Sequence, residues 1–318
     1  MASVADPGMQ YAHCEANDGC ALAFQTSLPL GGPDARYRRC VLLLHGFSGS
    51  SAYFARNFAA LRGRFWVVAP DMRGHGNSGR PRGGYHVARL AADLRDLVAH
   101  LRAACPDVDV AVVPVGCSIG AAVLWTYVEL FGRADFAGVA FVDQAPLQDR
   151  SPFGAWDAGR AHRGCYDEAT TLAAQRAWID DAAAAHRDLV RSCLGYRHEP
   201  EPGDGVSDEQ ARRDEEFFTR ISARCDGEWL ARLLADHTRY DHREAVELIT
   251  VPTLVMAGRR TGCFPLEGMR ETVRRVEAAR PGLGLAKMSV FDSGHWLFYE
   301  EPERFNREIA EFVDSCSR

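Results

Sequence analysis

The stretch VAVVPVGCSIGAAVLWTYVEL, residues 110–130, decides the fold. It begins with an apolar run of the length of a buried strand, continues with small residues around Gly116, Ser118 and Gly120, and ends with helical spacing. A strand, a sharp turn and a helix in this order place the Ser118 hydroxyl at the end of a sheet, beside a helix N-terminus. Because a serine becomes nucleophilic only when a base removes its proton, a catalytic role for Ser118 needs partners elsewhere in the chain.

Similar alternations of strand-like and helical segments surround this stretch. Two strands around Asn17-Asp18-Gly19, a hairpin turn signal, come first. Apolar runs with the length of strands lie at 40–44, 65–69, 109–115, 137–142, 253–257 and 287–291, and helical spacing covers 53–61, 86–103, 119–131, 266–279 and 302–313. Buried strands that alternate with helices predict an α/β fold with a mostly parallel central sheet and helices on both faces.

The alternation stops after Pro146 and resumes near residue 245. The intervening segment has no strand-like run, and Ser207 followed by Gln210 forms a capping box that predicts a helix start near Asp208. We therefore predict an α/β core made of residues 1–146 and 245–318, with a helical cap, residues 147–244, inserted after the sixth strand.

The composition narrows the function. The chain has 318 residues with a formal net charge of −6, which argues against a nucleic-acid or anionic-membrane partner. No apolar run is long enough for a membrane span, and no secretory signal is visible. The ten cysteines include no CxxC pair and indicate free thiols in a reducing compartment, so we expect a cytoplasmic protein. The sequence leaves a homodimer open.

Four motifs occur in a fixed order along the chain: LLLHGFSGS at 42–50, VVAPDMRGHGNSG at 67–79, GCSIGA at 116–121 and DSGHWLFYEEPERFNREIAEFV at 292–313. Together they make the chain resemble the α/β-hydrolase fold superfamily, in the branch of capped esterases, lactonases, epoxide hydrolases and haloperoxidase-like enzymes. The resemblance covers the core and not the insertion. It is specific for the fold and a poor guide to the reaction.

The resemblance implies a role for each motif residue. It assigns Ser118 as the nucleophile and His295 as the general base, and it assigns the backbone N–H groups of Phe47 and Ile119 to the oxyanion hole. A serine at this turn argues against the epoxide-hydrolase and haloalkane-dehalogenase reactions, because those members of the superfamily use an aspartate there. Neither a cofactor nor a metal is implied.

The triad acid is missing from its usual place. Most members carry it in a stretch like G-x-x-D-x-x-x-P, but this chain reads GRRTGCFP at 258–265, with Thr261 at the acid position. Three alternatives remain. Asp143, at the end of the strand before the insertion, supplies the carboxylate; or Asp292, three residues before His295, does so; or the chain has only a Ser-His dyad. We favour Asp143, because some members of the superfamily place the acid on that strand.

These assignments predict a serine hydrolase that cleaves a medium-sized hydrophobic carboxylic ester or lactone through an acyl-enzyme. Two alternatives stay open: a non-hydrolytic enzyme on the same fold, such as a cofactor-free dioxygenase, a C–C bond hydrolase or a cyclase, and a ligand-binding receptor. Aromatic side chains of the insertion and one beside the base are expected to line the substrate pocket. They are Trp156, Trp178, Phe217, Phe218 and Trp296.

Overall fold

The computed structural model describes residues 5–29, 39–106, 109–149 and 165–316. Within these residues, eight strands form one sheet in the order β1-β2-β4-β3-β5-β6-β7-β8. The pairs β1–β2 and β2–β4 are antiparallel and the other neighbouring pairs are parallel. The strands are β1 (Gln10–Glu15), β2 (Ala21–Thr26), β3 (Arg39–Leu44), β4 (Trp66–Pro70), β5 (Ala111–Cys117), β6 (Val139–Val142), β7 (Thr253–Gly258) and β8 (Ala286–Phe291).

Helices lie between the strands along the chain, and a helix is the last element. Their starts follow local chemistry: the Ser207 hydroxyl accepts the N–H of Gln210 at 3.2 Å, so a helix begins at Asp208 as the capping box predicts. The helices are η1 (Ser51–Phe54), α1 (Ala55–Leu61), α2 (Val87–Ala103), α3 (Ile119–Phe131), α4 (Glu168–Asp180), α5 (Ala182–Cys193), α6 (Gly195–His198), α7 (Asp208–Ser222), α8 (Gly227–Arg239), α9 (Arg243–Glu247), α10 (Leu266–Ala279), α11 (Leu297–Glu300) and α12 (Pro302–Ser315).

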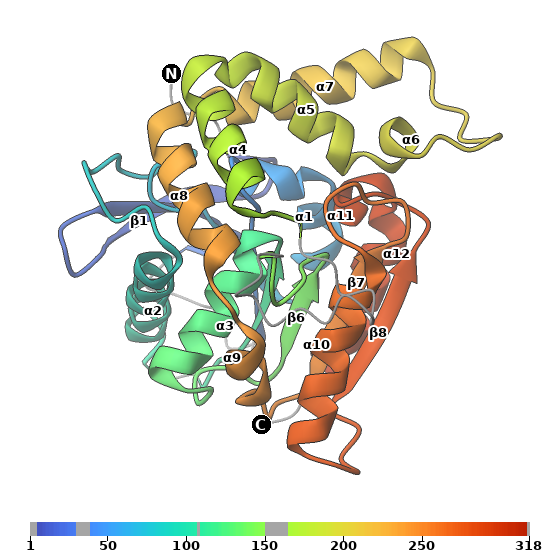
Figure 1. The fold of residues 1–318 in the computed structure, drawn as a ribbon. Helices are drawn as coiled ribbons and strands as arrows, with labels where there is room; N and C mark the ends of the chain where they lie inside the picture. Colours follow the sequence, from blue (N-terminus) through green and yellow to red (C-terminus); the bar gives the residue numbers. More distant parts are fainter. Residues whose placement is uncertain (1–4, 30–38, 107–108, 150–164, 317–318) are drawn as a thin grey trace.

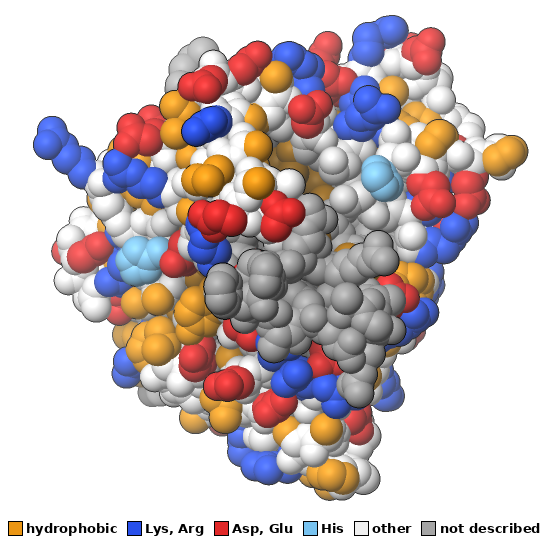
Figure 2. All heavy atoms as spheres, viewed as in Figure 1, with side chains coloured by type: hydrophobic (Ala, Val, Ile, Leu, Met, Phe, Trp, Pro, Cys, Tyr) orange, Lys and Arg blue, Asp and Glu red, His pale blue; other side chains and the backbone are white. Residues whose placement is uncertain are grey.

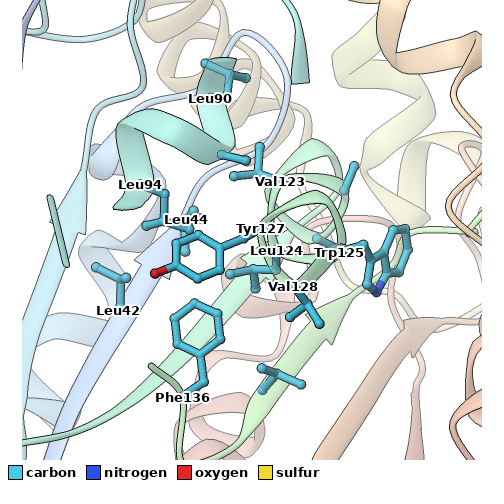
Figure 3. Close-up of a cluster of buried hydrophobic side chains, with 14 of the residues drawn as sticks. Leu42, Leu44, Leu90, Leu94, Val123, Leu124, Trp125, Tyr127, Val128 and Phe136 are labelled. Atoms are coloured by element: carbon cyan, nitrogen blue, oxygen red, sulfur yellow. The ribbon is translucent and has the colours of Figure 1, made fainter. Parts of the chain in front are cut away.

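Hydrophobic side chains cover both faces of the sheet. In β3, Leu42 and Leu44 belong to the cluster on one face, and Val41 and Leu43 to the cluster on the other, as the alternation of a strand requires. The first face carries α2, α3, α9 and α10, and the second carries α1, α11 and α12. Figure 3 shows the first cluster, in which side chains of α2 and α3 meet β3. The predicted doubly covered sheet is confirmed.

The strand that leads to Ser118 ends later than predicted. The sequence predicts its end at residue 115, whereas β5 continues to Cys117. The reason is pairing: Gly116 and Cys117 lie opposite Phe141 and Val142 of the parallel neighbour β6, so the ladder holds these small residues in extended form. Ser118 is therefore the first residue beyond the sheet.

The helices α4 to α8 follow β6 and lie largely beyond one end of the sheet (Figure 1). The end of α5 contacts the loops that follow β7 and β8: the N–H of Gly262 donates to Ser192 O at 2.9 Å, and that of His295 donates to Cys193 O at 2.7 Å. These helices thus lie over the carboxyl ends of the parallel strands, where α/β proteins bind their ligands. The predicted boundaries of a separate cap domain remain a prediction.

The surface carries charges of both signs. On the face in Figure 2, acidic and basic side chains are interspersed, and neither sign forms a continuous field over the described part of that face. Among the described helices, none combines the length and the apolar character that crossing a bilayer requires.

Candidate active site

Ser118 occupies a strained turn between β5 and α3. Its backbone has φ 54° and ψ −124°, a region that L residues rarely adopt and that costs of order 1–3 kcal/mol. The turn is tight because both flanking glycines are in close contact: a Cβ on Gly116 would lie 2.5 Å from the backbone of Gly120, and one on Gly120 would lie 2.8 Å from Leu44 O. The G-x-S-x-G pattern therefore has a steric cause.

Asp143 and His295 form a short buried pair. His295 Nδ1 lies 2.6 Å from Asp143 Oδ2, and the other carboxylate oxygen accepts the N–H of Gly258 at 3.0 Å. Asp143 directly follows β6 and is fully buried, while His295 comes from the loop between β8 and α11. Nδ1 therefore carries the proton in the neutral ring, and Nε2 is left to act as a base.

Asp292, the second candidate for the acid, and Thr261, the residue at the usual acid position, both have other partners. The Asp292 carboxylate pairs with Arg259 at 2.6 Å, whereas the His295 ring pairs with Asp143. The Thr261 hydroxyl accepts the N–H of Cys263 at 3.1 Å and stays within its own loop. The geometry thus agrees with the first of the three alternatives, a carboxylate supplied by Asp143, while its catalytic role remains a prediction.

Charge around His295 favours the imidazolium form. Burial alone opposes a charged ring, yet the pKa of His295 is raised, because the Cys263 sulfur and the Asp143 carboxylate both stabilise the protonated ring. Such stabilisation is what a base needs at the moment when it accepts a proton from a serine.

The two backbone groups assigned to the oxyanion hole belong to segments next to Ser118. Ile119 is the first residue of α3, and Phe47 follows Gly46, at which an added Cβ would lie 3.2 Å from Ser118 Cβ. Within the described residues, neither the Phe47 N–H nor the Ile119 N–H donates a hydrogen bond. Both donors are therefore available to a ligand, and the N-terminus of α3 adds its positive end.

Ser118 and His295 line one cavity of about 420 Å³. Its wall combines the loops at the carboxyl ends of the strands with helices α4, α5 and α8. The wall is mixed: Trp178 packs edge-to-face on Phe47 at 5.3 Å, whereas the buried Gln148 amide lies 2.9 Å from the ring of His237. The cavity thus offers aromatic surface with a few polar groups beside the serine.

The structure separates the residues predicted to line the substrate pocket. Trp178 lines the cavity, and Trp156 lies outside the described residues. Phe217, Phe218 and Trp296 are not among the lining residues and pack in an aromatic cluster instead, in which the rings of Phe218 and Trp296 stack at 3.6 Å. Their place in this cluster follows from the preference of aromatic rings for packing on one another in the interior.

Sequence reasoning missed several residues of the wall. Phe264, Gln148 and His237 all line the cavity, but they carry no periodic signal because two of them lie in loops. Cys263 also lines it, in place of the usual triad-acid loop, and together with Cys193 and His295 it forms a group that could hold a metal ion. The unusual sequence of the loop at 258–265 was the one available signal.

The family model described as alpha/beta hydrolase fold matches residues 39–302. The AB hydrolase superfamily protein YisY of Bacillus subtilis (strain 168) is 24% identical over 297 residues, which cover 89% of this chain and 94% of YisY.

Two solved structures share the fold at equal TM-scores of 0.77. An esterase from Exiguobacterium antarcticum is 19% identical and covers 96% of this chain and 99% of its own, and a bromoperoxidase from Bacillus anthracis is 20% identical with 96% and 100% covered. Likeness at this identity shows the fold and does not select a reaction. On the family match over most of its length, the chain belongs to the α/β-hydrolase fold family.

Proposed function

We propose that the protein is a serine hydrolase that cleaves a medium-sized hydrophobic carboxylic ester or lactone through an acyl-enzyme. The observation that carries the proposal is the 2.6 Å pair between His295 Nδ1 and Asp143 Oδ2, at a cavity that also exposes Ser118. A buried carboxylate that orients a histidine beside a serine at a strained turn is the arrangement that activates a hydroxyl.

In the proposed reaction, His295 Nε2 takes the proton of Ser118 as its Oγ attacks the substrate carbonyl carbon. The carbonyl π electrons move to the oxygen, and the N–H groups of Phe47 and Ile119 stabilise this oxyanion, each by about 3 kcal/mol. The tetrahedral intermediate then collapses: the C–O bond to the alcohol breaks, and the alcohol takes the proton from His295. A water molecule repeats the sequence on the acyl-enzyme, releases the acid and restores Ser118.

The substrate class is inferred from the cavity. A volume of about 420 Å³ falls within the range of small-molecule sites. Aromatic side chains such as Trp178 and Phe264 favour an apolar acyl or alcohol group, while Gln148 and His237 supply polar contacts on one side of the wall. No strongly cationic side chain lines the described cavity, so we propose a neutral ester or lactone in preference to an anionic one.

Covalent labelling tests the proposal. A fluorophosphonate probe should modify Ser118 of the folded protein at a rate that falls to background in Ser118→Ala, with the adduct located by peptide mass spectrometry. Ser78→Ala is the matched control, because Ser78 is a buried serine in a loop outside the cavity. Turnover of p-nitrophenyl esters should be lost with the label. If the folded protein is not modified by the probe and does not hydrolyse the esters, the hydrolase proposal is refuted, and a non-hydrolytic enzyme or a receptor is favoured.

A further inference from the structure

Two cysteines lie beside the proposed base. Cys193 ends α5, Cys263 belongs to the loop between β7 and α10, and His295 belongs to the loop between β8 and α11. The two sulfur atoms are 3.6 Å apart, and both lie within 4.8 Å of a ring nitrogen of His295. In the proposed hydrolytic mechanism neither thiol forms a bond to the substrate or transfers a proton, so the convergence of both on the histidine calls for a further explanation.

The spacing of the two sulfur atoms suits a tetrahedral metal ion. Zinc binds thiolates at about 2.3 Å and imidazole nitrogen at about 2.0 Å, so two thiolates on a tetrahedral zinc are about 3.8 Å apart. The observed distance of 3.6 Å between the sulfur atoms of Cys193 and Cys263 is close to that edge. Two cysteines and one histidine are also a ligand set that zinc uses where it keeps one position open.

The surroundings of His295 match those of a metal-ligating histidine. A metal-bound imidazole usually donates its second N–H to a carboxylate, which fixes the ring and raises its basicity. Here Nδ1 is already held by Asp143 at 2.6 Å, and Nε2 is the nitrogen left for a ligand. The same pair that would orient a base therefore also completes the outer shell of a metal site.

Backbone hydrogen bonds hold the three ligand segments together. The N–H of His295 donates to Cys193 O at 2.7 Å, and the N–H of Gly262 donates to Ser192 O at 2.9 Å. The Glu300 carboxylate also accepts the N–H groups of Gly195 and Gly294, at 3.0 and 2.9 Å. The donors are thus placed before any ion binds, which lowers the entropic cost of assembling the site.

We propose that Cys193, Cys263 and His295 form a binding site for Zn²⁺ or a similar thiophilic divalent cation. The ion is bound by the two sulfur atoms and by His295 Nε2, and its fourth position faces the cavity and takes water. In the bound state both sulfur atoms are thiolates and His295 Nε2 carries no proton, so the protons that the three groups held before binding are released to solvent. Cys263 and His295 line the cavity, so the ion enters through it.

Metal binding and ester hydrolysis exclude each other at this site. An ion on His295 Nε2 occupies the lone pair that would accept the Ser118 proton, so the loaded protein loses its base. This consequence rests on the proposed function, whereas binding of the ion does not. The site would make hydrolysis respond reversibly to the level of free zinc.

Cobalt is the spectroscopic probe for the test, because thiolate–Co²⁺ coordination gives a charge-transfer band in the near ultraviolet and tetrahedral Co²⁺ absorbs in the visible. Reduced, metal-free protein titrated with Co²⁺ should develop both bands at one equivalent, and Zn²⁺ should displace them. Cys193→Ser and Cys263→Ser should each lose most of the charge-transfer band. Asp143→Asn should keep the band but bind about 10- to 100-fold more weakly.

Cys105→Ser is the matched control, because Cys105 is a buried thiol outside the cluster, and its titration should match that of the unchanged protein. Circular dichroism shows that each variant is folded. A titration without thiolate bands, or with bands that survive in both cysteine variants, overturns the proposal.

In a separate measurement, Zn²⁺ should lower p-nitrophenyl ester turnover in the unchanged protein by more than about tenfold, and this ratio should fall towards one in Cys193→Ser. If turnover is absent while the cobalt bands appear, the hydrolase proposal fails and the metal site stands. If zinc inhibits but no thiolate band appears, the ion acts elsewhere and the metal proposal fails.

Discussion

Replacing the Asp143 carboxylate by an amide isolates the role of its charge. Asp143→Asn keeps the size of the side chain, and Asn Oδ1 can still accept either the Gly258 N–H or the His295 Nδ1–H. What is lost is a negative charge 2.6 Å from the ring, at a residue with 0% exposure. We expect the His295 ring to stay near its place, while its protonated form loses the attraction of the Asp143 carboxylate.

The size of the effect follows from the geometry. At an effective dielectric constant of about 20, two unit charges about 4 Å apart interact by roughly 4 kcal/mol. The imidazolium charge is spread over the ring, so about 4 kcal/mol is a fair value for a carboxylate in contact with one nitrogen. Since about 1.4 kcal/mol is a factor of ten, the turnover number should fall by about 10³.

The assay is kcat for a p-nitrophenyl ester at pH 8, with the burst amplitude recorded to separate acylation from deacylation. Two nearby variants are controls. Thr261→Ala should retain kcat within about threefold, because its hydroxyl bonds to Cys263 within its own loop. Asp292→Asn should do the same, because its carboxylate pairs with Arg259. Asp143→Asn with kcat within tenfold of the unchanged protein, and a normal melting temperature, refutes the assignment of the acid.

Three further perturbations test the turn, the buried histidines and the pocket. Gly120→Ala should lower the free energy of unfolding, measured in urea, by about 1–3 kcal/mol, because its Cβ would lie 2.8 Å from a carbonyl oxygen of β3. Gly83→Ala is the control and should not lower it, because no atom lies within 4 Å of the Cβ it would add. Equal effects of the two variants would contradict the steric explanation. Burial lowers the pKa of His45 to about 4 and that of His75 to about 3, so below pH 6.5 the unfolded chain takes up protons that the folded chain does not. The contribution of these two rings to the free energy of unfolding should therefore be constant above pH 7 and fall between pH 6.5 and pH 4.5 by up to about 1.4 kcal/mol per pH unit for each ring. Because the raised pKa of His295 acts in the opposite direction, the measurement compares urea midpoints of the unchanged protein and of His75→Gln at pH 7.5 and 5.5. The same pH dependence in both proteins would show that the His75 ring is not buried neutral. Trp178→Ala should raise KM for aromatic esters about tenfold and KM for acetyl esters by less, because the variant removes an aromatic side chain from the cavity wall. The same change in KM for both substrates would indicate that the aromatic group does not bind beside Trp178.

Local sequence patterns predicted several helices, strands and turns of this molecule correctly. The ranges predicted for α3 and α10, 119–131 and 266–279, agree with the structure, because apolar periodicity and small turn residues act within a few positions of the chain. The hairpin at Asn17-Asp18-Gly19 is confirmed for the same reason, with Gly19 at φ 82° between two antiparallel strands. Asp143 could be proposed because the carboxyl ends of parallel strands meet at one edge of a sheet.

Local sequence patterns did not predict which residues line the cavity. Phe217 and Phe218 read as candidate wall residues because they are aromatic and lie in the insertion, yet the rotation of α7 about its axis directs them into an aromatic cluster with Trp296. That rotation depends on neighbours contributed by distant segments, and one residue shifts it by about 100°. Sequence spacing alone therefore cannot say which side of a cap helix faces the substrate.

By itself the sequence determined the sheet and the turn that carries Ser118, because each of these depends on residues that are neighbours in the chain. Only the tertiary structure decided that Asp143 holds His295, and that Cys193 and Cys263 converge on the same ring. Those contacts join segments that lie far apart in the sequence. Their distances are set by how the strands and helices pack, which no local pattern encodes.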